Sequence, residues 1–179
     1  MNLHKVFFKL LFLTIFILTF FLPSRVFAES GYVLPYPAVM PGNKLHRVQE
    51  MKNMALKYWY FGSIGQFEYN RKMADTYLVE AKTLFEYKQY LLGFRALQKS
   101  NNYFEKAPFY LERAEKEGKD ISEKKEVLKK ASEKHKEVLS NMQQYTPKEF
   151  FWQPEKVKPT MLKIHEEIEK AIEIRNKLR

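Results

Sequence analysis

The chain has 179 residues, a net charge of +10 and no cysteine. The lack of cysteine excludes disulfide bonds, thiolate catalysis and cysteine-ligated metal sites. The length suffices for one domain with a hydrophobic core, and the stability of that domain must come from packing alone.

Residues 1–28 have the composition of a secretory signal peptide. Two lysines precede a charge-free apolar run at 10–22, and small residues lead up to a cleavage site between Ala28 and Glu29. The run is shorter than the roughly 20 apolar residues of a membrane span. We expect cleavage and a secreted or extracytoplasmic location; the alternative is an uncleaved N-terminal membrane anchor. Cleavage would lower the net charge to +7, because the leader holds three basic residues and no acid.

Residues 29–43 contain three closely spaced prolines, at positions 35, 37 and 41. Each proline fixes its own backbone and restrains the preceding residue to extended geometry, so this segment cannot be helical. Its apolar side chains predict an extended arm that packs along the surface of the domain. The alternative is a polyproline-type segment that is offered to a partner.

A helix is expected after the arm, with Asn43 or Gly42 able to cap its first turn. Its apolar residues recur at three- and four-residue spacing: Leu45, Val48, Met51, Ala55 and Trp59. Residues with this spacing share one face of a helix. We expect this face to pack into the core of a helical domain covering residues 44–117.

The same helix ends in four consecutive aromatic residues: Tyr58, Trp59, Tyr60 and Phe61. Four consecutive side chains cannot all face one core, because successive residues point in different directions around a helix. We expect them to cover the open end of the following hairpin. The alternative is a ligand-binding platform on which a glycan or a lipid fragment stacks.

Residues 67–107 predict two amphipathic helices folded back on each other, with a turn near 87–90. Small residues fall where the two helices would touch: Ala74, Ala81 and Ala96. The alternative is one long helix through position 88, which would be unusually long for a globular domain. Pro108 then either kinks the second helix or starts a new one at Phe109.

Three stretches resemble a family of exported helical domains of unknown function: PYPAVMPGNKLHRVQEMKN, KYWYFG and MADTYLVEAKTLFEYKQYLLGFRALQKS. The shared pattern is a Pro-Gly-x-x-Leu entry, an amphipathic helix and a hairpin with Ala-x-x-x-Leu-x-x-Ala spacing. The resemblance covers residues 32–106, and its most specific part is residues 34–45. It implies an exported helical bundle and transfers no catalytic residue.

Residues 118–179 predict a second helical hairpin, which either packs on the core or extends from it like a coiled coil. Asp120 and Glu123 have the spacing of a capping box at the start of its first helix. The apolar stripe of that helix recurs every seven residues: Ile121, Leu128, His135 and Met142. Because this stripe is narrow, we expect the helix to be peripheral and His135 to lie at the boundary of the core.

Residues 146–159 form a proline-bearing connector, after which the last helix is expected to run from Pro159 to Lys177. Three aromatic residues lie between prolines of this connector: Phe150, Phe151 and Trp152. We expect these rings to dock on the bundle. If they were exposed, they would form a hydrophobic patch for a partner or a membrane surface.

The sequence contains none of the motifs that would indicate an enzyme, such as HExxH, GxSxG or a glycine-rich phosphate loop. His46 with Glu50, and His165 with Glu169, have the four-residue spacing of a shared helix face. They would bind a metal only if two helices brought them together, and we interpret them as surface pairs. His135 does not belong to such a pair. We therefore predict no catalytic residue, no metal site, no cofactor and no enzymatic activity.

The fold class expected is all-α: a small bundle of about four to five helices with a signal peptide and an extended proline-rich arm. The function expected is a non-enzymatic interaction or scaffolding module of the cell envelope, whose partner is an envelope protein or polyanion. One alternative is the ligand-binding module described above. Another is salt-sensitive binding to envelope polyanions or anionic lipid, driven by the basic charge. Nucleic acid is not expected as a partner, and membrane attachment is expected only through a retained leader.

Overall fold

The computed structural model describes residues 31–37, 39, 41, 43–156 and 158–177, so the expected signal peptide and its cleavage site lie outside the described residues. In chain order the described elements are α2 (Lys44–Trp59), α3 (Gly62–Glu86), α4 (Tyr90–Lys116), α5 (Ser122–Tyr145), β1 (Glu149–Trp152), β2 (Thr160–Lys163) and α6 (Ile164–Asn176). The all-α bundle expected from the sequence is confirmed. None of the described helices has both the length and the apolar character needed to cross a membrane.

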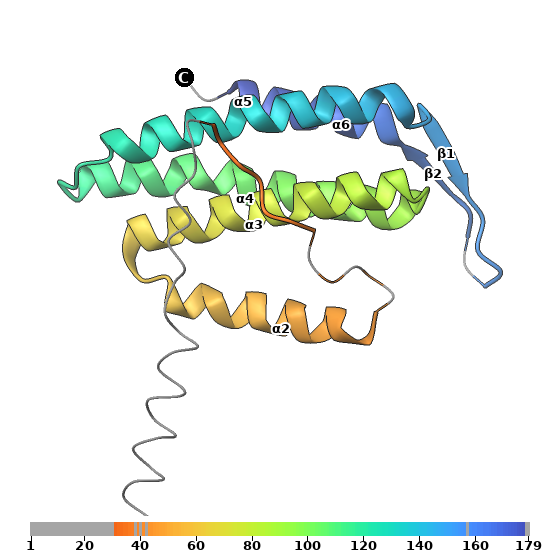
Figure 1. Ribbon diagram of the computed structural model, residues 1–179, viewed down its shortest axis with the longest axis horizontal. Coiled ribbons are helices and arrows are strands. Elements are labelled where there is room, and N and C mark those ends of the chain that lie inside the picture. The colour runs from red at the N-terminus through yellow and green to blue at the C-terminus, as the bar shows by residue number, and fades with distance from the viewer. Residues whose placement is uncertain (1–30, 38, 40, 42, 157, 178–179) are drawn as a thin grey trace, which may run out of the picture. The chain divides into compact units, whose positions relative to one another are not determined.

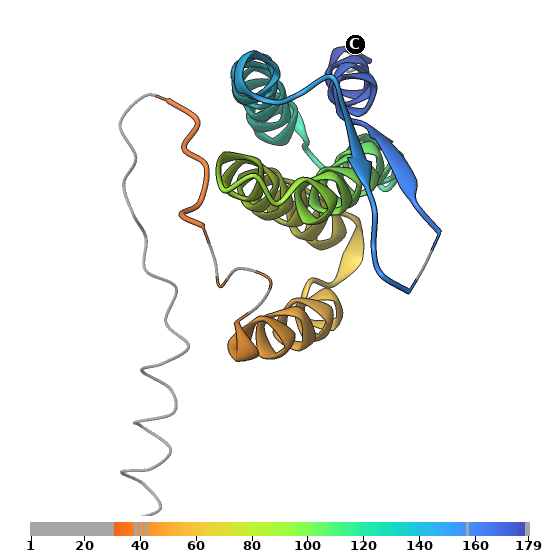
Figure 2. The ribbon, with the colours of Figure 1, turned by 90° about the vertical axis from the view of Figure 1, so that its right-hand side faces the viewer.

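The helices lie in three layers (Figures 1 and 2). The antiparallel pair α3 and α4 forms the middle layer, with α5 and α6 on one side and α2 on the other. The short strands β1 and β2 form a hairpin at one end of the α5–α6 layer. Of the outer layers, α5 and α6 share a hydrophobic core with α3 and α4, whereas α2 contacts mainly α3.

The turn expected in the middle of the central hairpin is confirmed, since α3 ends at Glu86 and α4 begins at Tyr90. Lys88 takes a left-handed backbone conformation with a φ of 57°, a conformation that usually requires glycine. Gly93 lets α4 start directly against α3, because a Cβ atom at this position would lie 2.8 Å from the Phe85 ring. The reversal therefore depends on close packing against Phe85 and not on turn residues such as Asn-Gly.

The small residues at the α3–α4 contact are all buried, as the spacing predicted: Ala74, Ala81 and Ala96. Side chains of this size let helix axes approach closely. The hydroxyl group of Ser100 on α4 donates a 2.8 Å hydrogen bond to the carbonyl oxygen of Ala74, which ties the two helices together at the contact. Helix α4 continues through Pro108, so no new helix starts at Phe109.

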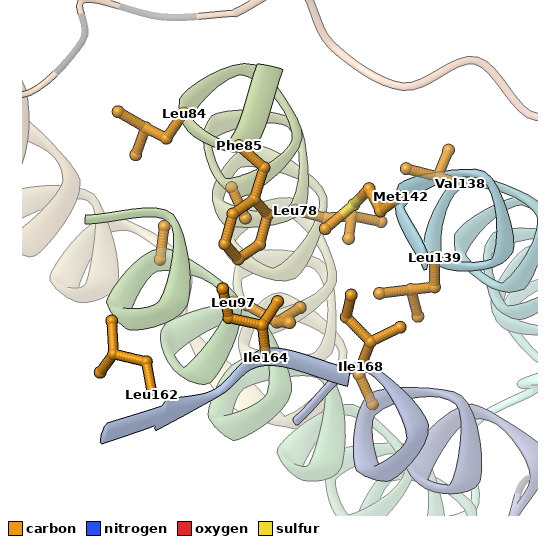
Figure 3. Close-up of a cluster of buried hydrophobic side chains, with 13 residues drawn as sticks. Leu78, Leu84, Phe85, Leu97, Val138, Leu139, Met142, Leu162, Ile164 and Ile168 are labelled. Atoms are coloured by element: carbon orange, nitrogen blue, oxygen red, sulfur yellow. The ribbon is translucent and has the colours of Figure 1, made fainter. Parts of the chain in front are cut away.

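The main hydrophobic core lies between the central hairpin, α5, β2 and α6 (Figure 3). Its buried side chains include Leu78, Leu84, Phe85, Leu97, Leu139, Met142, Leu162, Ile164 and Ile168. Burial of each side chain of this size contributes roughly 1.5–3 kcal/mol. The C-terminal half of the chain thus packs directly on the central hairpin.

The segment expected to be a connector contains strand β1, and β2 takes the place of the first turn of the expected last helix. Phe150 pairs with Leu162, and Phe151 pairs with Met161, in an antiparallel register. The last helix begins at Ile164 and not at Pro159, because the four residues between them form β2. A proline lacks the N–H group that a strand interior needs, and it therefore fits just before the strand.

Candidate docking surface and buried polar network

Helix α2 packs against the bundle through polar groups. The Lys99 ammonium group lies 2.8 Å from Glu50 Oε1, and the Tyr69 hydroxyl group donates a 3.1 Å hydrogen bond to the Asn53 carbonyl oxygen. Leu56 is the half-buried apolar residue that α2 adds to this contact. The hydrogen bond from Lys99 lowers the pKa of Glu50, so this carboxylate is ionised at neutral pH.

A second polar contact on this inner side joins His46 of α2 to Glu80 of α3, with 3.7 Å between His46 Nε2 and Glu80 Oε1. Burial raises the pKa of Glu80, because removing water disfavours the charged carboxylate, while the nearby His46 opposes the shift. The two contacts to Glu80 and Lys99 fix which side of α2 faces the bundle.

The apolar side of α2 consequently faces outward, which corrects the expectation that it enters the core. Its residues each expose between 59% and 78% of their surface: Leu45, Val48, Met51, Met54, Tyr58 and Trp59. The spacing of a stripe predicts which residues share a face but not toward what the face points. The polar partners on the central hairpin, Glu80 and Lys99, contact the other side of the helix. We call these six exposed residues the outer face of α2.

Basic side chains border the outer face. At about 100° per residue, Arg47 and Lys52 fall on either side of the line through Val48 and Met51. Both basic residues are exposed. Helix α2 contains one acidic residue, which faces inward and pairs with Lys99. The outer face is therefore apolar along its centre and cationic along its edges.

The four aromatic residues that end this helix do not point the same way. Tyr60 turns inward and its ring centroid lies 6.0 Å from that of Tyr69 on α3. Tyr58, Trp59 and Phe61 are exposed. Only Tyr60 therefore lies against the hairpin, while its three neighbours add aromatic surface to the C-terminal end of α2.

A pocket of about 370 Å³ lies beneath α2, lined by Glu50, Asn53, Met54, Tyr77, Lys99, Asn102, Tyr103 and Lys106. The rings of Tyr77 and Tyr103 stack with centroids 5.6 Å apart. The Lys99 ammonium group lies 5.0 Å from the Tyr77 centroid, and that of Lys106 lies 5.7 Å from the Tyr103 centroid. Lysines thus lie over both rings, and none of the four aromatic residues at positions 58–61 lines this pocket.

The aromatic residues of β1 alternate between the two sides of the hairpin. Phe150 packs on Tyr90 with 4.6 Å between ring centroids, and Trp152 is half-buried beside the main core. Phe151 is exposed on the opposite side, where its cross-strand partner Met161 is exposed as well. The three aromatic residues proposed as a partner site therefore do not form one continuous patch.

Inside the bundle, a chain of buried polar side chains crosses from α3 to α6. His135 Nε2 lies 2.8 Å from Asp75 Oδ1, and the Arg175 Nε–H group donates to His135 Nδ1 at 3.3 Å. An arginine can only donate, so Nδ1 is the acceptor and Nε2 carries the proton that it donates to Asp75. His135 is completely buried, which corrects its expected place at the core boundary.

Arg175 carries this network into α4. Its guanidinium group donates to Ser100 Oγ at 2.9 Å and to the side-chain oxygen of Asn101. The Asn101 amide group donates in turn to Glu167 Oε1 at 2.8 Å. Burial lowers the pKa of Arg175 to about 9, so the guanidinium group remains charged at neutral pH. The Phe104 ring lies against this cation, with 4.6 Å between the guanidinium carbon and the ring centroid.

The proline-rich arm joins the network at its other end. The Tyr32 hydroxyl group donates to Asp75 Oδ2 at 2.5 Å and accepts from Arg71 Nη1 at 2.6 Å. Arg71 also forms an ion pair with Glu68 at 2.8 Å. Leu34 packs on the main core. Tyr32 and Leu34 of the arm therefore contact the bundle, whereas Val33 and Tyr36 between and after them are exposed.

This network has the chemistry of a structural element. His135 has both ring nitrogens engaged and no exposed surface, so no substrate can reach a nitrogen that is free to accept a proton. In the part of the chain that the structure describes, no three acidic or histidine side chains are grouped as a metal site would require. The sequence signal for the network is the placement of His135 on an apolar stripe, but its partners on other helices cannot be predicted from spacing.

Scans of the chain against protein-family models, curated proteins and solved structures found no match. The resemblance to exported helical domains of unknown function therefore stays a prediction.

Proposed function

We propose that this chain is an exported, non-enzymatic interaction module of the cell envelope and that the outer face of α2 is its contact surface. One observation carries the proposal: α2 turns its polar side toward the bundle and its apolar side toward solvent. Export is inferred from the leader sequence, which lies outside the described residues.

The orientation of α2 is the reverse of what water alone favours. An amphipathic helix on a globular domain normally buries its apolar stripe and exposes its polar side. Contiguous exposed apolar surface typically marks a site of contact with a protein or membrane. The residues that hold α2 in place, such as Glu50 and Asn53, contact the bundle with polar groups and leave the stripe uncovered. A binding partner that covers the stripe would remove this apolar surface from water.

A non-enzymatic role fits the arrangement of the titratable groups in the core. Asp75 and His135 are the adjacent acid and base that most resemble catalytic groups. Both point into a packed interior in which Arg175 and Tyr32 occupy their remaining hydrogen-bonding positions. We assign these groups to the stability of the bundle.

Photo-crosslinking in cells tests the contact surface. A benzophenone amino acid placed at Met51 is expected to yield a defined adduct in the envelope fraction, because this position lies at the centre of the outer face. The matched control is the same amino acid at Phe109, an exposed apolar residue on α4. Equal adduct formation at both positions, or none at Met51, would contradict the proposal.

A further inference from the structure

We propose that the outer face of α2 binds the surface of a bilayer that contains anionic lipid, with the helix lying in the plane of the headgroups. This inference rests on the proposed function and names the partner of the same surface. It departs from the expectation that the membrane is contacted only through a retained leader, and it assigns the alternative of salt-sensitive binding to anionic lipid to one surface.

The side chains along the outer face are those that favour a membrane interface. Val48, Met51 and Met54 provide an apolar line that can enter the boundary between headgroups and acyl chains. Tyr58 and Trp59 lie at one end of that line and expose 78% and 74% of their surface. Tyrosine and tryptophan rings favour the headgroup level of a bilayer, because each combines an apolar ring with a polar group.

The charges beside the stripe specify the kind of lipid. Arg47 and Lys52 flank the apolar line, one on each side, and both are exposed. The one acid of α2, Glu50, is turned away and paired with Lys99. Cations at the edges of an apolar stripe are attracted to anionic headgroups and gain little from neutral ones.

The same charges argue against a second copy of this chain as the occupant. Two outer faces placed together would bring Arg47 and Lys52 of one copy near the identical cations of the other. Like charges in such a contact disfavour association. A bilayer surface presents the opposite charge over its whole area, so a face with cations on both edges fits it in any rotation about the membrane normal.

The bundle presents α2 as a preformed binding element. The contacts of Glu50 with Lys99 and of Asn53 with Tyr69 join the helix to α4 and α3 without using any outer-face residue. A helix of 16 residues is about 24 Å long. The apolar line is therefore already helical before it meets a bilayer, which removes part of the ordering cost of binding.

Vesicle binding of the protein purified from its own cells tests the inference. Vesicles of phosphatidylcholine with phosphatidylglycerol are expected to bind it at least about tenfold more tightly than phosphatidylcholine alone, and less tightly as salt rises. Val48→Asp, which places a carboxylate on the stripe, is expected to weaken binding to the anionic vesicles at least about tenfold. The double variant Arg47→Glu with Lys52→Glu is expected to weaken it at least as much.

Two matched controls distinguish changes at the outer face from the general effects of an added charge elsewhere on the bundle. Phe109→Asp alters a residue on α4 that is 60% exposed, as Val48 is. Lys116→Glu with Lys129→Glu changes the net charge by the same amount at exposed sites on α4 and α5. Both controls are expected to bind like the unaltered protein. All variants share one N-terminus, so any contribution of the leader cancels, and circular dichroism confirms that each is folded.

Equal binding to neutral and anionic vesicles, equal losses in the control variants, or no vesicle binding would each overturn the lipid inference. The crosslinking experiment then decides the fate of the proposed function. A protein adduct at Met51 without vesicle binding means that the outer face is a contact surface for a protein, and only the lipid assignment fails. If the protein neither binds vesicles nor forms an adduct at Met51, both proposals fail.

Discussion

Replacement of Asp75 by alanine is expected to lower the free energy of unfolding by about 3–5 kcal/mol, the range found when one partner of a buried charged network is removed. The carboxylate accepts from His135 on one oxygen and from Tyr32 and Arg71 on the other. Alanine would leave the buried Nε2–H group of His135 without an acceptor. It would also remove the negative charge that balances Arg71 and Arg175 inside the bundle.

Thermal or urea unfolding of the Asp75→Ala variant measures this effect, and the melting temperature is expected to fall by about 10 °C. Glu126→Ala is the control, because this carboxylate is exposed and lies 3.7 Å from Lys130 on the surface of α5. Removing such a surface pair changes stability by less than about 1 kcal/mol. Similar losses in the two variants would show that the buried network does not stabilise the bundle as we describe.

Stability is also expected to fall as the pH is lowered from 6.5 toward 5. Burial, helped by the nearby cations Arg175 and Arg71, lowers the pKa of His135 below its ordinary value of 6.5, although Asp75 opposes the shift. The unfolded chain therefore binds a proton in this window that the folded chain does not bind, and acid favours unfolding. Each unit of difference between the two pKa values corresponds to about 1.4 kcal/mol. Above pH 6.5 this group leaves stability unchanged.

The structural cause of this pH dependence lies at one ring nitrogen of His135. A proton on His135 Nδ1 would face the N–H group of Arg175 and replace a hydrogen bond with two opposed donors. Denaturant unfolding at pH 7.5 and pH 5.5 should show a smaller decline in His135→Gln than in the unaltered protein, and an unchanged decline in the control His165→Gln. The raised pKa of Glu80 acts in the opposite direction as the pH falls, but it is common to all three proteins and cancels in the comparison. Equal declines in all three would contradict the role of His135.

The features that the sequence predicted correctly depend on short-range spacing. The all-α fold, the reversal before Tyr90 and the buried alanines of the central hairpin follow from three- and four-residue periodicity and from helix length. The Asn43 side chain accepts from the Leu45 N–H group at the start of α2, as its capping role requires. These properties are local, so one sequence is enough to predict them.

The features that the sequence did not predict depend on contacts between distant elements. The polar side of α2 contacts Glu80 and Lys99, which lie on other helices. The strands β1 and β2 contain four residues each, too few for alternation to stand out between prolines. The acceptor of the buried His135 is 60 residues away in the chain. Periodicity assigns residues to a face but cannot identify what that face meets.

The central claim, that α2 holds its apolar face outward, is tested most directly by the fluorescence of Trp59. The chain has two tryptophans, so Trp152→Phe leaves Trp59 as the only tryptophan, which is excited at a wavelength that tyrosine does not absorb. We predict emission typical of tryptophan in water and strong quenching by acrylamide, because Trp59 is 74% exposed. Blue-shifted emission that resists quenching in the monomer would mean that the stripe packs on the bundle, and it would contradict the account.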